Sequence, residues 1–200
     1  METKHTDTQI SRPVVDQAKL EKICHEFLVA IGEDPTREGL VDTPKRFAKM
    51  WKAFIERDPG KLGTSFSCKQ LDQMVIVSGI RIYSFCEHHI IPFWADIHIG
   101  YIADKCLLGA SKLARIARKH AQKLNIQEEM VAAIAKEISE LAKTENVAVV
   151  ANGMHLCMVM RGAETEAKFM SSEMMGVFRH KPEARAEFMQ LCFHSGTPGF

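Results

Sequence analysis

Apolar residues recur at helical spacing near the start of the chain, and this pattern predicts two helices. Across residues 13–31 they recur near helical spacing, and Gly32 ends the pattern. A second helix is predicted from Thr43 to about Glu56, because a threonine N-cap followed by Pro44 is typical of a helix start. Its predicted buried side chains are Phe47, Met50, Trp51 and Phe54.

The middle of the chain alternates between apolar and polar positions, which predicts strands. Residues 74–85 are rich in Val, Ile and Tyr, with Ser78-Gly79 as a candidate bulge. Residues 94–102 alternate so that four side chains share one face, namely Ala95, Ile97, Ile99 and Tyr101. The connection between these strands contains Cys86-Glu87-His88-His89.

Further periodic segments complete an α+β pattern. They are predicted helices at 111–124 and 126–143, strand segments at 147–151, 155–160 and 168–178, and a closing helix at 182–194. A turn or bulge is expected at Asn152-Gly153. After the N-terminal helices the order is β-β-α-α-β-β, which favours an antiparallel sheet with helices on one face. Such a sheet leaves two edges and one face uncovered, and this favours oligomerisation.

Composition is that of an ordinary globular protein and excludes several classes. The 200 residues carry a net charge of +1 at pH 7, with 46% hydrophobic and 26% charged residues. A nearly neutral chain has no general attraction to nucleic acid or anionic membranes, and no apolar run reaches the roughly 18 residues of a membrane span. Residues 1–12 are predicted to be a flexible tail; they are polar and lack the apolar core of a secretion signal, so a cytoplasmic location is expected. We expect a helical region at 13–70, a sheet-containing domain at 71–194 and a second tail at 195–200.

Cysteines and histidines are spaced in a way that predicts a metal site. In a chain without an export signal, cysteines are more often buried, catalytic or metal-bound than paired. Cys86 and His89 have the spacing of two ligands on one turn, and Cys157 is the best candidate for a third ligand. On its predicted strand, Cys157 shares a face with His155 and Arg161, as in a lined pocket.

Three soft ligands with an open fourth position are the catalytic arrangement of zinc, in which bound water ionises near pH 7. His88 and His155 would then be imidazoles suited to proton transfer. Three other interpretations stay open at this point. The histidines could be core residues beside an inert cysteine; His88 or His155 could close a structural site as fourth ligand; or Cys86 could be a nucleophile with a histidine base.

Basic residues are placed where they could hold a polyphosphate. Lys112 and Arg115 share a face of the helix that starts near Ser111, and a helix N-terminus attracts phosphate. Arg161 is predicted to face the metal pocket, and Arg46 lies on the second N-terminal helix. The alternative for each basic residue is a solvated surface charge, and for Ser111 it is an N-cap role.

The dipeptide Gln127-Glu128 lies at the start of the predicted helix at 126–143. With Asn125 as the N-cap, Glu128 stands at the third helical position, as in a capping box. From these residues alone, capping is the favoured role of Glu128.

Short motifs in a fixed order carry a resemblance to a known family. They are Gly-Glu-Asp-Pro-Thr-Arg-Glu-Gly-Leu at 32–40, Asp-Thr-Pro-Lys-Arg at 42–46, Met-Val-Ile-Val at 74–77, Cys-Glu-His-His at 86–89, Gly-Ala-Ser-Lys-Leu-Ala-Arg at 109–115, Gln-Glu at 127–128, His-Leu-Cys-Met at 155–158 and Arg-Gly at 161–162. With them the chain resembles GTP cyclohydrolase I from about residue 32 to residue 188. Ser78-Gly79 departs from the Arg-Asp of many members, and residues 169–173 match only loosely.

The resemblance implies a fold, an assembly and a reaction. The family has the tunnelling fold, whose β-β-α-α-β-β unit is preceded by helices, so residues 71–194 would form the catalytic domain. Its subunits form toroidal homo-oligomers, commonly decamers, with active sites at subunit interfaces. The implied reaction is zinc-dependent hydrolysis of GTP at C8, with ring opening, formate release and rearrangement to 7,8-dihydroneopterin triphosphate.

The resemblance also implies a metal centre and its acid–base groups. Cys86, His89 and Cys157 would bind Zn²⁺ as the cofactor, and this ligand set is the one that the spacing favours. His88 would donate and accept the proton during attack and ring opening, and His155 would be the second acid–base group.

The substrate contacts follow from the same resemblance. Glu128, beside Gln127, would bind the pyrimidine edge of guanine, since a carboxylate can accept two parallel N–H bonds. Ser111 would assist rearrangement of the opened ribose. The residues implied in triphosphate binding are Lys112, Arg115, Arg161 and Arg46. GTP is thus the expected partner, and neither nucleic acid nor a membrane is expected.

Two other functions would use the same residues differently. A nitrile reductase of the same fold would act on a deazaguanine through a catalytic cysteine and NADPH, but no nicotinamide-binding signature is evident and His88 argues against it. A zinc-stabilised scaffold that binds a pterin or nucleotide without catalysis would make His88 and His155 dispensable. The hydrolase is the favoured interpretation.

Overall fold

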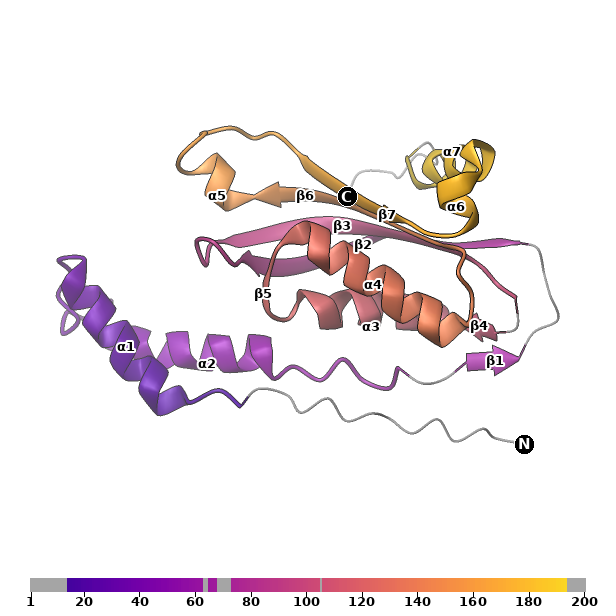
Figure 1. The fold of residues 1–200 in the computed structure, drawn as a ribbon. Helices are drawn as coiled ribbons and strands as arrows, with labels where there is room; N and C mark the ends of the chain where they lie inside the picture. The colour runs from indigo at the N-terminus through magenta and orange to yellow at the C-terminus, as the bar shows by residue number, and fades with distance from the viewer. Residues whose placement is uncertain (1–13, 63–64, 68–72, 105, 194–200) are drawn as a thin grey trace. The chain divides into compact units, whose positions relative to one another are not determined.

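The structure is a computed structural model that describes residues 14–62, 65–67, 73–104 and 106–193 (Figure 1). The chain forms two compact units, one of residues 1–58 and the other of residues 59–200. The predicted tails at 1–12 and 195–200, and the predicted boundary at residue 70, lie outside the described residues. None of the described helices is long and apolar enough to cross a membrane.

The first unit is a pair of packed helices, α1 (Gln17–Ala30) and α2 (Thr43–Ile55). Asp16 caps α1, because its carboxylate accepts a hydrogen bond from the Lys19 backbone N–H at 3.0 Å. Gly32 follows the helix with a φ of 87°, a conformation that glycine adopts without strain. The predicted end of this helix at Gly32 is therefore confirmed.

The second helix starts one residue away from the predicted cap. Asp42 is the N-cap and Thr43 is already helical, so the prediction of Thr43 as N-cap is wrong. The reason is the preceding turn, in which the Thr43 N–H donates to the Leu40 carbonyl at 2.8 Å. Pro44 lies in the first turn, where its missing N–H costs nothing.

The aromatic side chains of α2 are less buried than predicted. Phe47, Trp51 and Phe54 are half-buried, Met50 is exposed, and only Ala48 is fully buried on this helix. The rings cover one another edge to face, with centroid distances of 6.2 Å between Phe47 and Trp51 and 6.0 Å between Trp51 and Phe54. A two-helix unit has too little interior to bury all of them.

The second unit is built on a five-stranded sheet of order β5-β2-β3-β6-β7. Neighbouring long strands are antiparallel, and only the short β5 pairs in parallel, with β2. The bounds are β2 Met74–Cys86, β3 Pro92–Ile102, β5 Leu124–Asn125, β6 Val147–His155 and β7 Phe169–Met174. The predicted bulge is confirmed, since the register shifts between Val77 and Ile80 and Gly79 has a φ of 73°.

Helices α3 (Ala110–Ala121) and α4 (Gln127–Ala142) cover one face of this sheet (Figure 1). The four β3 side chains that were predicted to share a face are all fully buried, and they are Ala95, Ile97, Ile99 and Tyr101. They pack in one core with the apolar stripes of the two helices, which include Leu113, Ile116, Met130 and Ile134. Burial of this stripe against the sheet is the main source of stability in the unit.

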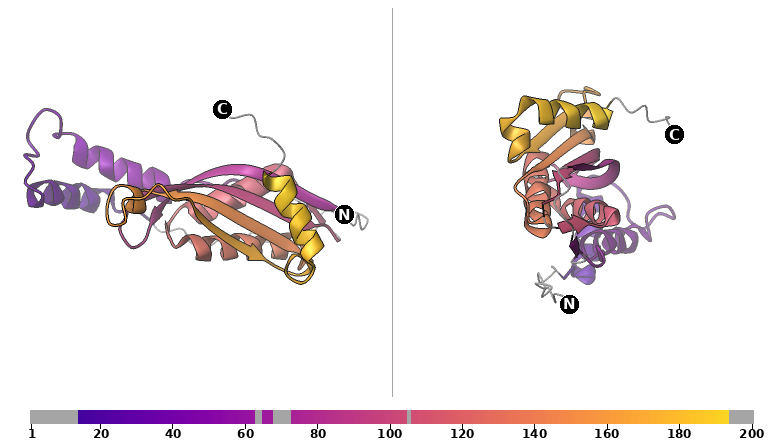
Figure 2. Two further views of the ribbon diagram at one scale, coloured as in Figure 1. Left: turned by 90° about the horizontal axis from the view of Figure 1, so that it is seen from above. Right: turned by 90° about the vertical axis from the view of Figure 1, so that its right-hand side faces the viewer.

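A third layer lies on the opposite face of the sheet, formed by α6 (Val177–His180) and α7 (Pro182–Phe193) (Figure 2). Phe188 packs directly on Gly100 of β3, where an added Cβ would come within 2.7 Å of the ring. Nearby, the Nδ1 atom of His98 lies 2.7 Å from the Ser78 hydroxyl. The prediction of helices on one face therefore holds for α3 and α4, and α7 covers part of the other face.

The region around Asn152-Gly153 differs from the prediction of a turn followed by a strand. β6 runs without interruption to His155, and residues after it form one helical turn, α5 (Leu156–Val159). Gly153 stands in the strand because an added Cβ would collide with the side chain of Gln127. Its small size thus serves a close contact rather than a turn.

Two further segments refine the predicted pattern. A two-stranded sheet pairs β1 (Ser65–Ser67), which lies in the region predicted as helical at 13–70, with β4 (Cys106–Leu108). The last strand β7 is shorter than predicted, because Gly176, with a φ of 53°, turns the chain into α6. An added Cβ at Gly176 would collide with the Asn146 side chain, so glycine is required at this turn.

Candidate metal centre and active site

Cys86, His89 and Cys157 come together at one end of the sheet. Cys86 is the last residue of β2, His89 lies in the turn before β3, and Cys157 lies on α5 immediately after β6. One ligand atom from each lies within 4.8 Å of the other two. The structure thus brings together the three residues that the sequence predicts as ligands, although Cys157 lies on a helical turn and not on the predicted strand.

A tight turn presents Cys86 and His89 together. The Cys86 N–H donates to the Ile91 carbonyl at 2.9 Å, and the Ile90 N–H donates back to the Cys86 carbonyl at 2.8 Å. Ile90 has a φ of 55°, a left-handed conformation that is unfavourable for a β-branched residue. These hydrogen bonds hold the strained residue and thereby fix the turn.

The donor set fits a soft divalent ion. Two sulfurs and one imidazole suit zinc, whereas Mg²⁺ and Ca²⁺ prefer oxygen ligands. Burial, together with the neighbouring Cys86 sulfur, raises the pKa of the Cys157 thiol, and a backbone hydrogen bond and Arg161 oppose this only in part. Two thiolates at this distance therefore need a bound cation, and metal binding would release their protons.

The group has three members within the described residues, and neither His88 nor His155 belongs to it. His88 is exposed, with its Nδ1 atom 3.6 Å from the Cys86 sulfur. Arg161, also exposed, donates from Nη1 to Nε2 of His89 at 2.6 Å. The arrangement favours a three-ligand site, with basic and acid–base side chains beside it, over a closed structural site.

His155 is held much more firmly than His88. Its ring is buried and stacks on Phe93, with a centroid distance of 4.2 Å and an interplanar angle of 6°. The ring of Phe169 is nearly perpendicular to it, with a centroid distance of 5.2 Å. Its Nε2 atom lies 3.0 Å from Oε1 of Gln127. Burial lowers the pKa of His155, and the negative charge of Glu128 opposes that effect. The imidazole is therefore neutral near pH 7.

Gln127 and Glu128 are adjacent at the start of α4 but differ in exposure. Gln127 is 1% exposed, whereas Glu128 is exposed to solvent. The capping interpretation of Glu128 is wrong, because the N-cap is Ile126 and makes no side-chain hydrogen bond. Asn125 lies in β5, and its amide nitrogen donates to the Ser84 hydroxyl at 2.9 Å.

Two cations converge near the start of α3. Lys112 is only 5% exposed, and its Nζ atom donates to the Lys61 carbonyl at 3.3 Å. Arg115 donates to the same carbonyl at 3.2 Å and is otherwise exposed. Gly109 is the N-cap of this helix, so Ser111 is an exposed residue of the first turn and not the cap. Together with the helix N-terminus, these side chains form an anion-attracting region.

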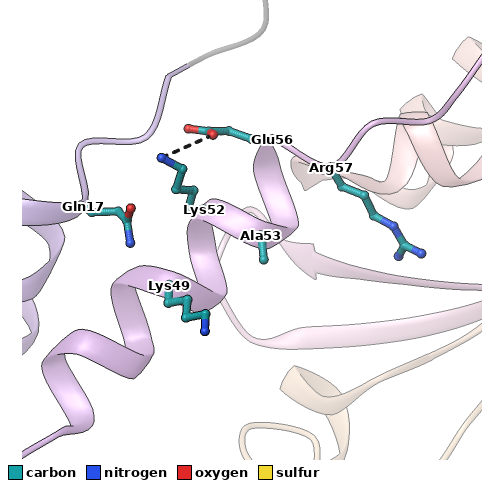
Figure 3. Close-up of a pocket in the computed structure, with 6 residues that line it drawn as sticks. All are labelled: Gln17, Lys49, Lys52, Ala53, Glu56 and Arg57. Atoms are coloured by element: carbon teal, nitrogen blue, oxygen red, sulfur yellow. Dashed lines mark ion pairs between the residues drawn. The ribbon is translucent and has the colours of Figure 1, made fainter.

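Arg46 belongs to the first unit, where it forms an exposed ion pair with Asp42 at 3.3 Å on α2. The same unit has a shallow hollow of about 440 Å³ (Figure 3). Its lining consists of Gln17, Lys49, Lys52, Ala53, Glu56 and Arg57. Glu56 already pairs with Lys52 at 3.8 Å and accepts the Val15 N–H, so the hollow contains no unsatisfied acid that would mark a site.

Sequence reasoning missed three residues that shape the site: Phe93, Phe169 and Gly153. The two aromatic residues enclose His155, and Gly153 makes room for Gln127. Phe93 lies two residues before Ala95, and side chains two apart in a strand point to the same face. The alternation in β3 could therefore have placed Phe93 on the buried face. Nothing in the local pattern could have revealed that Gly153 faces α4.

An antiparallel sheet backed by helices, with two cysteines and one histidine gathered at its end, defines an α+β protein with a three-residue group that can hold a metal ion. The model of the GTP cyclohydrolase I family matches residues 20–193. The chain belongs to this family, and its fold is the family's tunnelling fold.

Individual relatives agree with the family assignment. GTP cyclohydrolase 1 of Sulfurihydrogenibium sp. (strain YO3AOP1) is 40% identical over 179 residues, which cover 89% of this chain and 96% of the relative. GTP cyclohydrolase 1 of Deinococcus radiodurans is 42% identical over 176 residues, covering 85% and 81% respectively. A solved structure of apo archaeosine synthase QueF-Like covers 50% of this chain and 91% of that chain, at 11% identity and a TM-score of 0.36, a likeness too slight to bear on the chemistry.

Proposed function

We propose that this protein is a zinc-dependent GTP cyclohydrolase I, which converts GTP into 7,8-dihydroneopterin triphosphate and formate. The observation that carries the proposal is the convergence of Cys86, His89 and Cys157 in a chain of this family. Ring opening and deformylation each consume one water, and closure of the new ring releases one, so the net reaction uses a single water. No redox cofactor is needed.

Two histidines in different surroundings would carry out the proton transfers. When zinc is bound by the Cys-His-Cys group, it lowers the pKa of water and so supplies hydroxide near neutral pH. His88, exposed beside the Cys86 sulfur, would exchange a proton with the attacked purine and with solvent. His155, buried and neutral, would act as the second proton-transfer group on the ring-opened substrate.

The substrate-binding groups are proposed from chemistry and exposure. The exposed Glu128 carboxylate would accept two N–H bonds from the pyrimidine edge of guanine. The cations Lys112, Arg115, Arg161 and Arg46 would bind the triphosphate, and Ser111 would assist rearrangement of the opened ribose. Lys112 is the strongest of these candidates, because a lysine that is 5% exposed beside a second cation gains most from a bound anion.

The test is to incubate zinc-loaded protein with GTP while formate and the absorbance of the pterin are followed together. Both products are expected in equal amounts, and ATP, which lacks the guanine edge that Glu128 would bind, serves as control substrate. His88→Ala should keep the metal and lose turnover. A fully metallated protein that binds GTP but releases no formate would support the scaffold function and overturn the proposal.

We also propose a toroidal homo-oligomer, a decamer by analogy with the family, with active sites at subunit interfaces. β5 and β7 are the outer strands of the five-stranded sheet in the described part of the chain, and these two edges, with several exposed apolar side chains, support an assembly. A cytoplasmic location is proposed because a reducing compartment keeps Cys86 and Cys157 available as metal ligands.

A further inference from the structure

Three groups at the junction of α4, β6 and β7 share one hydrogen-bond arrangement. The Gln127 amide nitrogen donates to the Phe169 carbonyl at 3.1 Å and to the Ser171 hydroxyl at 3.0 Å. Its Oε1 atom lies 3.0 Å from Nε2 of His155. All hydrogen-bonding capacity of the Gln127 donors is therefore used inside the protein.

The orientation of this amide is fixed by chemistry. A backbone carbonyl can only accept, so the group that faces Phe169 must be the NH₂ group of Gln127. The oxygen then faces His155, and an amide oxygen can only accept. The Nε2 atom of His155 must consequently carry a hydrogen, which leaves Nδ1 as the nitrogen with a lone pair in the neutral ring.

Gly153 makes this arrangement possible. Gly153 and His155 are two residues apart on β6, so they face the same side of the sheet. An added Cβ at Gly153 would collide with Oε1 of Gln127, so glycine lets the amide approach the strand closely. The stacked ring of Phe93 and the edge of Phe169 then prevent His155 from turning away.

From these contacts we infer that Gln127 is a positioning residue, which holds His155 as its Nε2–H tautomer and directs Nδ1 to proton transfer. Gln127 is 1% exposed and has no donor left for guanine, so it acts through His155 and not on the substrate. The role in proton transfer rests on the proposed function, whereas the tautomer does not.

The first test is spectroscopic and uses the zinc-loaded wild-type protein labelled with ¹⁵N-histidine. We expect a one-bond ¹⁵N–¹H correlation from Nε2 of His155, protected from exchange with solvent, and an unprotonated Nδ1. Gln127→Met, which removes the acceptor at similar size, should lose that protected signal, whereas Gln127→Glu, which keeps an acceptor oxygen, should retain it. A wild-type spectrum with the proton on Nδ1 would overturn the inference without any variant.

The second test separates positioning from substrate binding. Gln127→Met should lower kcat about 10- to 100-fold, as loss of a supporting hydrogen bond to a reactive group commonly does, with little change in KM for GTP. A raised KM with unchanged kcat would place Gln127 on the substrate instead. Gln190→Met makes the same chemical change at an exposed position of α7 and should alter neither value.

A milder variant covers the case in which Gln127→Met fails to fold. Ser171→Ala removes one of the two bonds that orient the Gln127 amide and should reduce kcat less, with a weaker Nε2 signal. An unchanged signal and unchanged kcat in Ser171→Ala would also count against the inference. If wild-type protein shows the expected tautomer but releases no formate from GTP, the proposed function fails and the hydrogen-bond assignment stands.

Discussion

The two cysteines of the metal group lie on different kinds of secondary structure. Cys86 closes a long strand and is 5% exposed, whereas Cys157 lies on the one-turn helix α5 and is half-buried. Cys86 is a buried member of the core of the second unit, whereas Cys157 packs against that core only in part. Substitution of Cys157 is therefore the cleaner way to test the metal site, because it disturbs less packing.

Cys157→Ser should lose zinc and cyclohydrolase activity together. A serine oxygen is a poorer ligand than a thiolate for this ion and stays protonated near pH 7, so we expect bound zinc to fall at least about tenfold. Elemental analysis of the dialysed protein measures the loss. Cys106→Ser, on β4 outside the metal group, should keep full metal content. Full zinc in Cys157→Ser would exclude Cys157 as a ligand.

At the scale of single elements, the turn between β2 and β3 stores backbone strain next to two ligands. Ile90 adopts a left-handed conformation, and its side chain is 55% exposed, so little burial compensates for the strain. The motif Cys-Glu-His-His reveals the chemistry of this turn but not its geometry. Isoleucine favours extended backbone, so no propensity argument predicts a positive φ at this position.

The strain at Ile90 predicts that glycine is more stabilising than alanine at this position, the reverse of their usual order. Ile90→Gly should be more stable than Ile90→Ala by about 1 kcal/mol, because glycine adopts the left-handed conformation without a Cβ clash. At an ordinary helical position the order is reversed, so Ala132→Gly on exposed α4 surface should lose about 1 kcal/mol. Denaturant unfolding of all three variants measures both differences. Equal stability of the two Ile90 variants would show that the turn is not strained.

The end of α7 packs against a second buried histidine. His98 is buried between the Ser78 hydroxyl, 2.7 Å from its Nδ1 atom, and the ring of Phe193, with a centroid distance of 4.6 Å. Burial lowers the pKa of His98, and the nearby Asp96 carboxylate opposes the effect. The end of α7 thus packs on an imidazole that must stay neutral.

This packing predicts a pH-dependent stability. Below about pH 6.5 the unfolded chain binds a proton at His98 that the folded protein does not bind. The stability that comes from packing against neutral His98 is therefore fully present above that pH. It is lost as the pH falls from there toward the lower pKa of His98 in the folded state. Between about pH 7 and pH 5 we expect the free energy of unfolding, measured with urea, to fall more in the wild type than in His98→Asn. Identical losses would contradict the assignment.

For the molecule as a whole, the sequence predicted the sheet, its cover of α3 and α4 and the three residues that gather as a candidate metal group, but not how remote segments meet. The alternation in β3 and the periodicity of α3 and α4 identified the core of the second unit, because burial there follows the local sequence pattern. The stripe of α2 did not, since its aromatic side chains are only half-buried and Met50 is exposed. The course of residues 152–157 could not be predicted, because a glycine in a strand and a glycine in a turn look alike without the partner. That partner, Gln127, comes from another helix.

An apolar stripe on α1 remains exposed on the first unit. Its members are Ile23, Phe27 and Ile31, with exposed fractions of 45%, 58% and 57%. They fall four positions apart and therefore lie on one side of α1 and its C-cap residue Ile31, next to the buried Cys24 and Leu28. Large exposed apolar side chains in a row are typical of an interface, which agrees with the proposed oligomer.

Phe27→Lys should accordingly shift the protein toward smaller assemblies, because a charged side chain cannot be buried in an apolar contact without a large cost. Light scattering after size-exclusion chromatography measures the native mass. His25→Lys introduces the same charge on the opposite side of α1 and should leave the mass unchanged. An unaltered mass in both variants would remove this stripe from the proposed interface.

The close fit of Gly153 against Gln127 has an evolutionary consequence. A chain that replaces the glycine by any larger residue must shorten or move the amide, and a chain without the amide no longer requires glycine there. Positions 127 and 153 should therefore co-vary when many family members are aligned, although 26 residues separate them in sequence. Such co-variation would show that the contact between α4 and β6 has constrained both positions during evolution.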